Sequence, residues 1–430
     1  MHDLVIRGGR VIDPSQTIDA VMDVAIDGAR ISAVEQSLGD GGVPGGMGQV
    51  FEANGLIVTP GFVDLHTHVY FGVPPLGVEA DPNCLAKGVT TAVDAGSAGS
   101  STFPGFRRYV IDVAATRIVA MLHISSIGMA RDDGAANEVV GELEDIRWAR
   151  VDRAIDIARA HADVIVGIKV RLSESMVGSD PDQCREALRR AREAADAIGK
   201  PTMVHVGGTS VGIDELLSML VRGDIVTHCF HGRTEGVIGD DGKIRSSVRQ
   251  AVDRGIIFDV GHGAGSFNFG VARRALDLGM EPGTISSDIH AWSIGGPAYD
   301  LATTASKFLH LGMTLPEVVR RITQTPASAI AMAGRLGTLS PGAEGDVTIS
   351  RLSEGEWPYR DTSGTIEVGR SRLEPVAVVR AGRVYPCTPT TYRPDAGHAT
   401  EPIDPHTWSH GHIHHALHSH GNGSMHTHQS

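Results

Sequence analysis

The chain of 430 residues lacks the features of a membrane, nucleic-acid-binding or disulfide-rich protein. It has no run of about 18 apolar residues that could span a bilayer, and the stretch from Met1 to Arg10 is typical of a strand and not of a signal peptide. The four cysteines form no C-x-x-C pair, which argues against a disulfide framework or a structural zinc knot. The formal net charge is −13 and no dense Lys/Arg cluster occurs, which argues against a nucleic-acid partner. We therefore expect a cytoplasmic protein that acts on a small molecule.

Aromatic residues are also scarce, at 5%, whereas glycine is abundant, with 53 residues. This composition suits a fold with many short turns between repeated strands and helices. The chain is longer than one compact domain needs, so a large domain with a smaller partner is the natural expectation.

The two ends of this sequence, before the tail, share a strand-like pattern. From Leu4 to about Thr59, apolar and polar residues alternate between turn residues, and similar segments return around Val347 and Val378. We predict that residues 1–59 and 337–388 together build a small β-sandwich domain.

Between these ends, over residues 60–336, short apolar runs alternate with stretches of helical periodicity, which is typical of repeated β-α units and a parallel sheet. Eight such runs occur, as expected for a (β/α)8 barrel of this size. The expected strands are Gly61–His66, Val89–Asp94, Ile118–Ile124, Val164–Val170, Thr202–Val206, Ile225–Cys229, Ile256–Val260 and Thr284–Asp288.

The composition changes abruptly after Thr388. Nine of the 21 histidines fall between His406 and His428, interleaved with Gly, Ser and Thr. We predict that residues 389–430 form a disordered tail, because no core-forming pattern is present. An auxiliary metal-collecting role is our interpretation, and a quiet extension or a remnant affinity element is the alternative.

The motif D-L-H-T-H, Asp64 to His68, stands at the end of the first expected strand. Side chains two residues apart on a strand point to the same side, so His66 and His68 can bind one metal ion. Taken alone, an H-x-H pair is weak support for a metal site, because core and surface histidines are as common.

Further polar residues stand at or near the C-terminal ends of the fourth, fifth, sixth and eighth expected strands. In a barrel this rim carries the active site, and histidines scattered for structural reasons would not collect there. We infer a metal site built from His66, His68, Lys169, His205, His228 and Asp288.

Lys169 is the informative member, because an ammonium group within an apolar strand is costly to desolvate unless it is neutralised or paired. One interpretation is an ordinary buried lysine–carboxylate pair. The other is that the amine has reacted with carbon dioxide to form a carbamate, whose anionic oxygens can bridge two cations.

The set of H-x-H on strand one with Lys, His, His and Asp on strands four, five, six and eight resembles the amidohydrolase superfamily. The resemblance covers nearly the whole chain except the histidine-rich tail, and in that family the small β domain is likewise assembled from both termini. The motifs G-I-K-V-R, H-C-F-H-G and S-S-D-I-H resemble most closely its deacetylase-like branch. Members of that branch hydrolyse N-acyl amino acids or acetylated hydroxy acids.

The resemblance implies two divalent ions, expected to be zinc. The H-x-H pair and Asp288 would hold the more buried ion, the histidines of strands five and six the more exposed one, and a carbamate on Lys169 would join them. A bridging hydroxide would attack the acyl carbonyl of the substrate. Asp288 would accept the proton of the nucleophile and deliver it to the leaving group, as a general base and acid.

Candidates for the substrate pocket are Arg171, His290, Tyr70, His262 and His231. Arg171 and His290 each stand two residues beyond a candidate ligand, so strand parity turns them toward the barrel mouth, where the guanidinium would anchor a substrate carboxylate. A surface or interdomain ion pair is the alternative for Arg171, and a satisfied loop histidine is the alternative for His262. We interpret His123, on the third strand, as structural.

Other activities share parts of this pattern. A cyclic-amide hydrolase of the dihydroorotase or hydantoinase kind has the same ligand set, although dihydroorotases carry an arginine just after H-x-H, where this chain has Val69 and Tyr70. A deaminase needs one metal and no bridging lysine, and a lactonase or phosphotriesterase departs from the local motifs. A non-catalytic assembly protein on this fold would have lost ligands, whereas this chain retains all six. We therefore expect a homo-oligomeric hydrolase.

Overall fold

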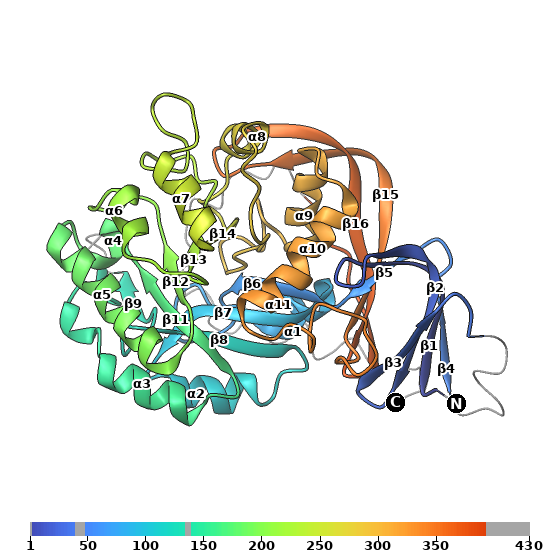
Figure 1. Cartoon of the computed structure of the whole chain (residues 1–430). Helices are drawn as coiled ribbons and strands as arrows, with labels where there is room; N and C mark the ends of the chain where they lie inside the picture. The colour runs from blue at the N-terminus through green and yellow to red at the C-terminus, as the bar shows by residue number, and fades with distance from the viewer. Residues whose placement is uncertain (1, 39–47, 134–138, 393–430) are drawn as a thin grey trace, which may run out of the picture. The chain divides into compact units, whose positions relative to one another are not determined.

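The computed structural model describes residues 2–38, 48–133 and 139–392 (Figure 1). The chain divides into two compact units, residues 1–394 and 395–430, and the histidine-rich part of the tail lies outside the described residues. None of the described helices combines the length and the apolar character that crossing a membrane requires.

Seven parallel strands form the central sheet, in the order β14-β13-β12-β11-β8-β7-β6, so each strand lies beside the one before it in this series. Their bounds are β6 (Phe62–Thr67), β7 (Val89–Gly99), β8 (Arg117–His123), β11 (Ile165–Arg171), β12 (Thr202–His205), β13 (Ile225–Thr227) and β14 (Ile257–Asp259). Every second residue of a strand points to the same face of the sheet. Residues of one face, such as Val63 of β6, Val93 of β7 and Val119 of β8, pack in one buried cluster inside the curled sheet. The predicted α/β fold with a parallel sheet is confirmed.

The eighth expected strand, Thr284–Asp288, is not a strand in the structure. Thr284 makes a single parallel bridge with Asp259 of β14, and Ile289 makes one with Thr67 of β6. Between these bridges the backbone N–H of Ser287 donates to the Asp64 carboxylate over 3.0 Å. The segment therefore lies beside both edge strands, but side-chain acceptors replace part of the ladder that a regular strand would form.

Helices pack against the outer face of the sheet, where their apolar residues and those of the strands form the largest buried cluster. The principal helices are α3 (Val151–Ala160), α5 (Pro181–Ile198), α6 (Ile213–Ser218), α7 (Ser246–Arg254), α8 (Phe269–Asp277), α9 (Leu301–His310), α10 (Leu315–Ile322) and α11 (Gln324–Ala329). Short helical turns are α1 (Ala80–Asn83), η2 (Leu85–Lys87), α2 (Phe103–Phe106), η3 (Arg107–Ile111), η4 (Ile146–Trp148) and α4 (Glu174–Val177).

The longest helix, α5, shows how the sequence sets its limits. Asp180 caps its first turn by accepting a hydrogen bond from the backbone of Asp182, and Pro181 takes the first helical position, where no N–H is needed. Gly199 ends the helix in the left-handed conformation that only glycine adopts without strain.

The strands from both ends of the chain form one mixed sheet, in the order β17-β16-β15-β5-β1-β2-β3, with β4 also paired to β1. Their bounds are β1 (Leu4–Asp13), β2 (Ile18–Asp27), β3 (Arg30–Glu35), β4 (Gln49–Glu52), β5 (Ile57–Pro60), β15 (Val347–Arg360), β16 (Ile366–Arg380) and β17 (Arg383–Pro386). A small separate ladder joins β9 (Arg131–Asp133) to β10 (Val139–Gly141). We predicted a sandwich, whereas the described strands are hydrogen-bonded along a single sheet with its own apolar cluster.

The hairpin of β15 and β16, which the prediction assigned to the small domain, also contacts the barrel. Figure 1 shows both strands running from the mixed sheet to α9. The side chains of Tyr359 and Leu373 belong to the apolar cluster of the barrel, and the Asp361 carboxylate accepts from the backbone of Phe269 over 3.1 Å. The distal half of the hairpin is thus part of the wall of the large domain.

Candidate metal centre

The six predicted metal ligands lie at one end of the parallel sheet. His66 is on β6 and His68 follows it, Lys169 is on β11, and His205 is the last residue of β12. His228 directly follows β13, and Asp288 lies in the segment beside β6. Because the carboxyl ends of parallel strands meet at the same edge, residues far apart in the sequence come together there.

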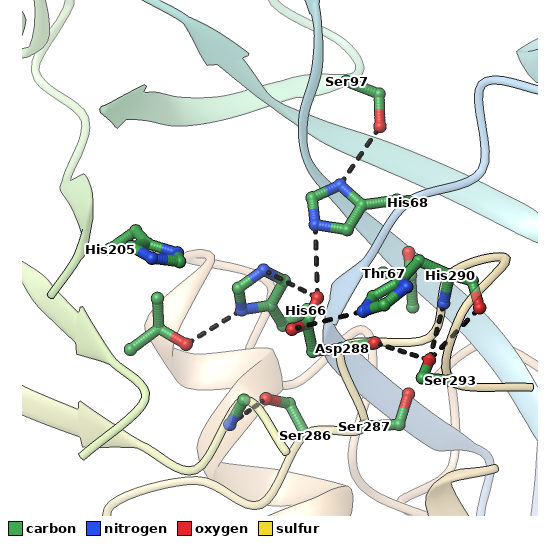
Figure 2. Close-up of polar contacts among 12 residues, drawn as sticks. His66, Thr67, His68, Ser97, His205, Ser286, Ser287, Asp288, His290 and Ser293 are labelled. Atoms are coloured by element: carbon green, nitrogen blue, oxygen red, sulfur yellow. Dashed lines mark hydrogen bonds and ion pairs between the residues drawn. The ribbon is translucent and has the colours of Figure 1, made fainter. Parts of the chain in front are cut away.

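His66, His68 and Asp288 form a compact group of donor atoms that could hold a metal ion, with one atom of each residue within 4.8 Å of the others. Figure 2 shows both rings turned toward the carboxylate; Asp288 Oδ1 is 3.3 Å from His66 Nε2 and 3.2 Å from His68 Nε2. This Oδ1 atom is buried and has no hydrogen-bond partner among the described residues. A buried carboxylate oxygen without a donor costs free energy, which a cation at this position would recover.

A second pair of donors lies beside the first group. His228 Nε2 and His205 Nδ1 face each other at 2.7 Å, and the Lys169 amine lies 3.5 Å from His66 Nε2. In the described part of the chain, Lys169 makes no ion pair with a carboxylate, so the ordinary lysine–carboxylate pair is absent there. The donor set of imidazole and carboxylate is one that zinc favours.

Three of the histidines have their other ring nitrogen held by a neighbour. His66 Nδ1 lies 2.8 Å from the Thr227 hydroxyl, and His68 Nδ1 lies 3.2 Å from the Ser97 hydroxyl. His228 Nδ1 donates to the carbonyl of Gly261 over 2.7 Å. Such outer contacts orient metal-ligating histidines, and they leave the Nε2 atoms free to face the cavity.

Burial sets the charge state of these groups. It lowers the pKa of His68 to about 3 and holds the pKa of His66 and His228 well below the ordinary value, so these rings are neutral at pH 7. It raises the pKa of Asp288 to about 6 and lowers that of Lys169 to about 7. Neutral imidazoles and a partly neutral amine are the forms that bind cations and add to carbon dioxide.

Two of the candidate ligands adopt a backbone conformation that side chains rarely take. The φ angle is +71° at His228 and +49° at Asp288. Left-handed backbone costs free energy at residues other than glycine, and such strain is concentrated at functional sites. This feature has no signal in the sequence.

A cavity of about 290 Å³ opens over these donors. All six predicted ligands line it, as do the predicted pocket residues Arg171 and His290. Of the lining residues that we did not predict, Arg233 and Trp292 have the largest side chains, and the others are Leu76, Ala264, Gly265 and Ser266. Arg233 stands two residues after His231 in the motif H-G-R. The motif alone does not indicate a pocket residue, because the loop conformation brings Arg233 to the cavity.

Arg171 has two surroundings, and its ion pair is buried within the barrel and is not the surface or interdomain pair that the sequence left open. It lines the cavity, yet its guanidinium lies 3.3 Å from the Glu142 carboxylate in a buried ion pair. His123 is fully buried and lies 3.5 Å from the same carboxylate. Glu142 follows the short strand β10. It was not predicted, because nothing in the local sequence indicates that it contacts β11.

Three predicted pocket residues, Tyr70, His262 and His231, do not line this cavity. Tyr70 turns away to stack on Phe106, with the ring centroids 4.6 Å apart. His262 is fully buried behind the site, with its Nε2 only 2.6 Å from the Lys307 amine. His231 is also buried, and its Nδ1 accepts from the backbone of Arg233 over 3.1 Å. In each case loop backbone, which strand parity does not describe, sets the direction of the side chain.

Comparison with known proteins found no matching family model. The chain is 36% identical to a deacetylase of Brucella anthropi over 381 residues, which cover 88% of this chain and 90% of the relative. It is 31% identical to a deacetylase of Enterococcus faecalis, with 89% and 99% covered.

Solved structures give the same picture. A crystal structure of an adenine deaminase superposes with a TM-score of 0.80 at 30% identity, covering 90% of this chain and all of the other. A crystal structure of a dihydroorotase gives a TM-score of 0.80 at 32% identity, covering 91% of this chain and 99% of the other. The fold is therefore shared with both of these solved structures.

Proposed function

The chain belongs to the amidohydrolase superfamily and is a hydrolytic enzyme, and from this premise we propose that it cleaves an amide or ester bond of a small carboxylate-bearing substrate. An N-acyl amino acid or an acetylated 2-hydroxy acid is the substrate class. The observation that carries the proposal is the convergence of six polar side chains, from the ends of four strands and from the segment beside β6, on one cavity.

We propose two divalent ions, with zinc as the metal. His66, His68 and Asp288 would hold one ion, and His205 and His228 the other. The neutral amine of Lys169 can react with carbon dioxide, and the carbamate so formed would join the two ions. When bound, such ions supply a hydroxide near neutral pH and polarise an acyl carbonyl. The fit is supported by the unpartnered Oδ1 of Asp288 and by the ring nitrogens that face the cavity.

Asp288 is the proposed proton carrier. Its carboxylate lines the cavity, and in the metal-free chain burial raises its pKa to about 6. From this position the carboxylate would accept the proton of the attacking nucleophile and give it to the leaving nitrogen or oxygen. His290 Nε2 lies 4.0 Å from Asp288 Oδ2, and the ring stands on the cavity side of the carboxylate.

Two guanidinium groups support a substrate with a carboxylate. Arg171 and Arg233 both line the cavity. Glu142 pairs with Arg171, whereas Arg233 makes no ion pair within the described residues. We propose that Arg233 holds the substrate carboxylate and that Arg171 contributes from the side.

We also propose that the segment from Thr284 to Ile289 closes the parallel sheet into an eight-membered barrel. Its bridges to β14 and β6, the two edge strands of the described sheet, support this closure. The cytoplasmic location and the homo-oligomeric state stay predictions from the sequence.

The test is a hydrolysis screen of the zinc-loaded chain against N-acetyl D- and L-amino acids and acetylated 2-hydroxy acids. We expect turnover of at least one of these classes. Asp288→Asn should lower the turnover number by about 10²- to 10⁴-fold, as loss of general acid–base catalysis does, while much of the metal stays bound. Full activity of this variant would contradict the proposed role of Asp288.

A second candidate, hydrolysis of a cyclic amide, is favoured by the crystal structure of a dihydroorotase at 32% identity. Cyclic ureides therefore belong in the same screen. Turnover of a cyclic ureide alone, with no acyl amino acid or acetylated hydroxy acid accepted, would replace the first proposal by the second.

A further inference from the structure

One fully buried carboxylate lies behind the cavity and takes no part in the proposed chemistry. Asp259, the last residue of β14, accepts hydrogen bonds from the hydroxyls of Thr227, Ser286 and Thr284, over 2.8, 2.7 and 2.6 Å. Two of these hydroxyls, those of Thr227 and Ser286, share its Oδ2 atom. A carboxylate can only accept, so the proton of each hydroxyl is directed to Asp259.

The first arm of this network reaches His66. Because the Thr227 hydroxyl gives its proton to Asp259, only its lone pair is left for His66 Nδ1, 2.8 Å away. His66 must then carry its ring proton on Nδ1. Its Nε2 lone pair consequently faces the cavity, toward Asp288 Oδ1.

The second arm reaches His228. The Ser286 hydroxyl donates to Asp259 and accepts from the backbone N–H of Gly261 over 3.0 Å, a contact drawn in Figure 2. The carbonyl of the same glycine accepts from His228 Nδ1 over 2.7 Å. His228 Nε2 is thereby also left without a proton, facing His205.

Gly261 shows how tightly the two arms are packed together. Its φ angle is +48°, and a Cβ atom there would lie 2.8 Å from His228 Nδ1 and 3.1 Å from His66 Nδ1, and closer still to the Thr227 hydroxyl. The backbone of one glycine therefore fills the space between the outer nitrogens of both histidines.

We propose that Asp259 is a positioning residue for one histidine donor of each ion: through Thr227 it sets the ring tautomer of His66, and through Ser286 it holds in place the Gly261 backbone whose carbonyl fixes the tautomer of His228. This inference rests on the proposed two-ion site. It gives the carboxyl end of β14 a role, although none of the six candidate ligands comes from that strand.

The matched pair Thr227→Val and Thr284→Val tests the proposal. Both variants remove a hydroxyl that donates to the same carboxylate, but only Thr227 contacts a histidine. In ¹⁵N-histidine spectra of the metal-free full chain, assigned with His66→Gln and His228→Gln, we expect both rings protonated on Nδ1. Thr227→Val should shift His66 toward the Nε2-protonated form and leave His228 unchanged, and Thr284→Val should change neither.

Zinc affinity gives the second readout, by competition with a chelator on the full chain. The double variant His66→Ala/His228→Ala measures the zinc bound by the tail, which is then subtracted. Thr227→Val should weaken binding by about 10- to 100-fold, the usual cost of losing an outer partner, with Thr227→Ser restoring it. Ser286→Ala should weaken binding of the other ion.

Asp259→Asn is the conservative variant. Its amide oxygen can still accept from Thr227 and Ser286 while the amide nitrogen donates to Thr284, so we expect both tautomers to persist. An unchanged His66 tautomer in Thr227→Val, or an equal loss of zinc in Thr284→Val, would overturn the inference. Should the unsubstituted chain bind no zinc above the tail background, the two-ion proposal fails, and the tautomers still decide whether Asp259 sets the rings.

Discussion

The cavity and the junction between α9 and the β15–β16 hairpin each contain a completely buried lysine, and the two differ in their partners. The Lys307 amine contacts the carbonyls of Pro297 and Arg360 over 2.9 and 2.7 Å and lies 2.6 Å from His262 Nε2. The contact described for the Lys169 amine is with His66 Nε2, at 3.5 Å. Burial lowers the pKa of both lysines to about 7.

The pKa therefore does not separate the two lysines, whereas their hydrogen bonds do. Lys307 has an acceptor for each of its protons and links three segments, which is a structural role. Lys169 lines the cavity, and among the described residues its amine has one long contact, to His66 Nε2, so burying its remaining donors is costly unless another group completes the site. The partners of the two buried lysines, and not their pKa values, therefore distinguish the cavity from the junction.

The largest effect is expected when Lys169, the lysine of the cavity, is replaced. Lys169→Ala should lower turnover by more than about 100-fold, since loss of an outer partner alone can cost that much. Added formate or acetate should restore part of the activity, because a small carboxylate can occupy the position of the carbamate. Lys307→Met is the control, and it should lower the melting temperature but leave the zinc content unchanged. Full turnover and full zinc content in Lys169→Ala would contradict the account.

The next effect contrasts two glycines with left-handed backbone. Gly261→Ala would push a methyl group into His66 and His228, whereas Gly312, which follows α9, has no atom within 4 Å of an added Cβ. We expect Gly261→Ala to weaken zinc binding by about 10- to 100-fold. Gly312→Ala should cost only about 1–2 kcal/mol of stability, with normal zinc binding. Chelator competition and thermal unfolding measure these results; equal zinc affinities would contradict the crowding at Gly261.

The same distinction separates two arginines of the cavity wall. Arg233→Met should raise the KM for carboxylate-bearing substrates by about 10-fold or more, because a charge-assisted hydrogen bond contributes about 1.5–3 kcal/mol. The KM for a neutral acyl amide should hardly change. Arg171→Met should instead lower the melting temperature, because it removes the cation nearest to the buried Glu142 carboxylate. A larger KM effect at Arg171 than at Arg233 would reverse our assignment.

The smallest effect is a pH dependence at the junction. The pKa of Lys307 is about 7 in the folded chain against 10.5 ordinarily, so between these pH values the unfolded chain binds more protons. The unfolding free energy of the metal-free chain should therefore rise with pH in this window, by up to about 1.4 kcal/mol per pH unit for one lysine. Lys307→Met should remove its share of that slope in denaturant titrations at pH 7.5 to about 9.5. An unchanged slope would show that Lys307 stays charged.

The sequence predicted the parallel sheet and the placement of the candidate ligands because both depend on strand periodicity. Seven of the expected strands are present, and His66, Lys169 and His205 lie on strands whose direction the alternation fixes. The pocket was predicted less well, since Tyr70 and His262 lie on loops, where backbone dihedrals and not parity orient side chains.

Contacts between residues far apart in the sequence could not be predicted either. Glu142 meets Arg171, and the Asp259 network joins three strand ends, only after the sheet has curled. The positive φ angles of His228 and Asp288 belong to the same class, because nothing in their residue types requires them. Periodicity gives the direction of a side chain along one strand, but not what it meets across the fold.

The most direct measurement is anomalous diffraction at the zinc edge from crystals grown with zinc and bicarbonate. The account predicts two peaks, about 3.5–4 Å apart, among the six candidate ligands, with extra density extending from the Lys169 amine. It also separates these ions from any zinc held by the histidine-rich tail. A cavity without peaks, or two peaks beside an unmodified Lys169, would contradict the central claim.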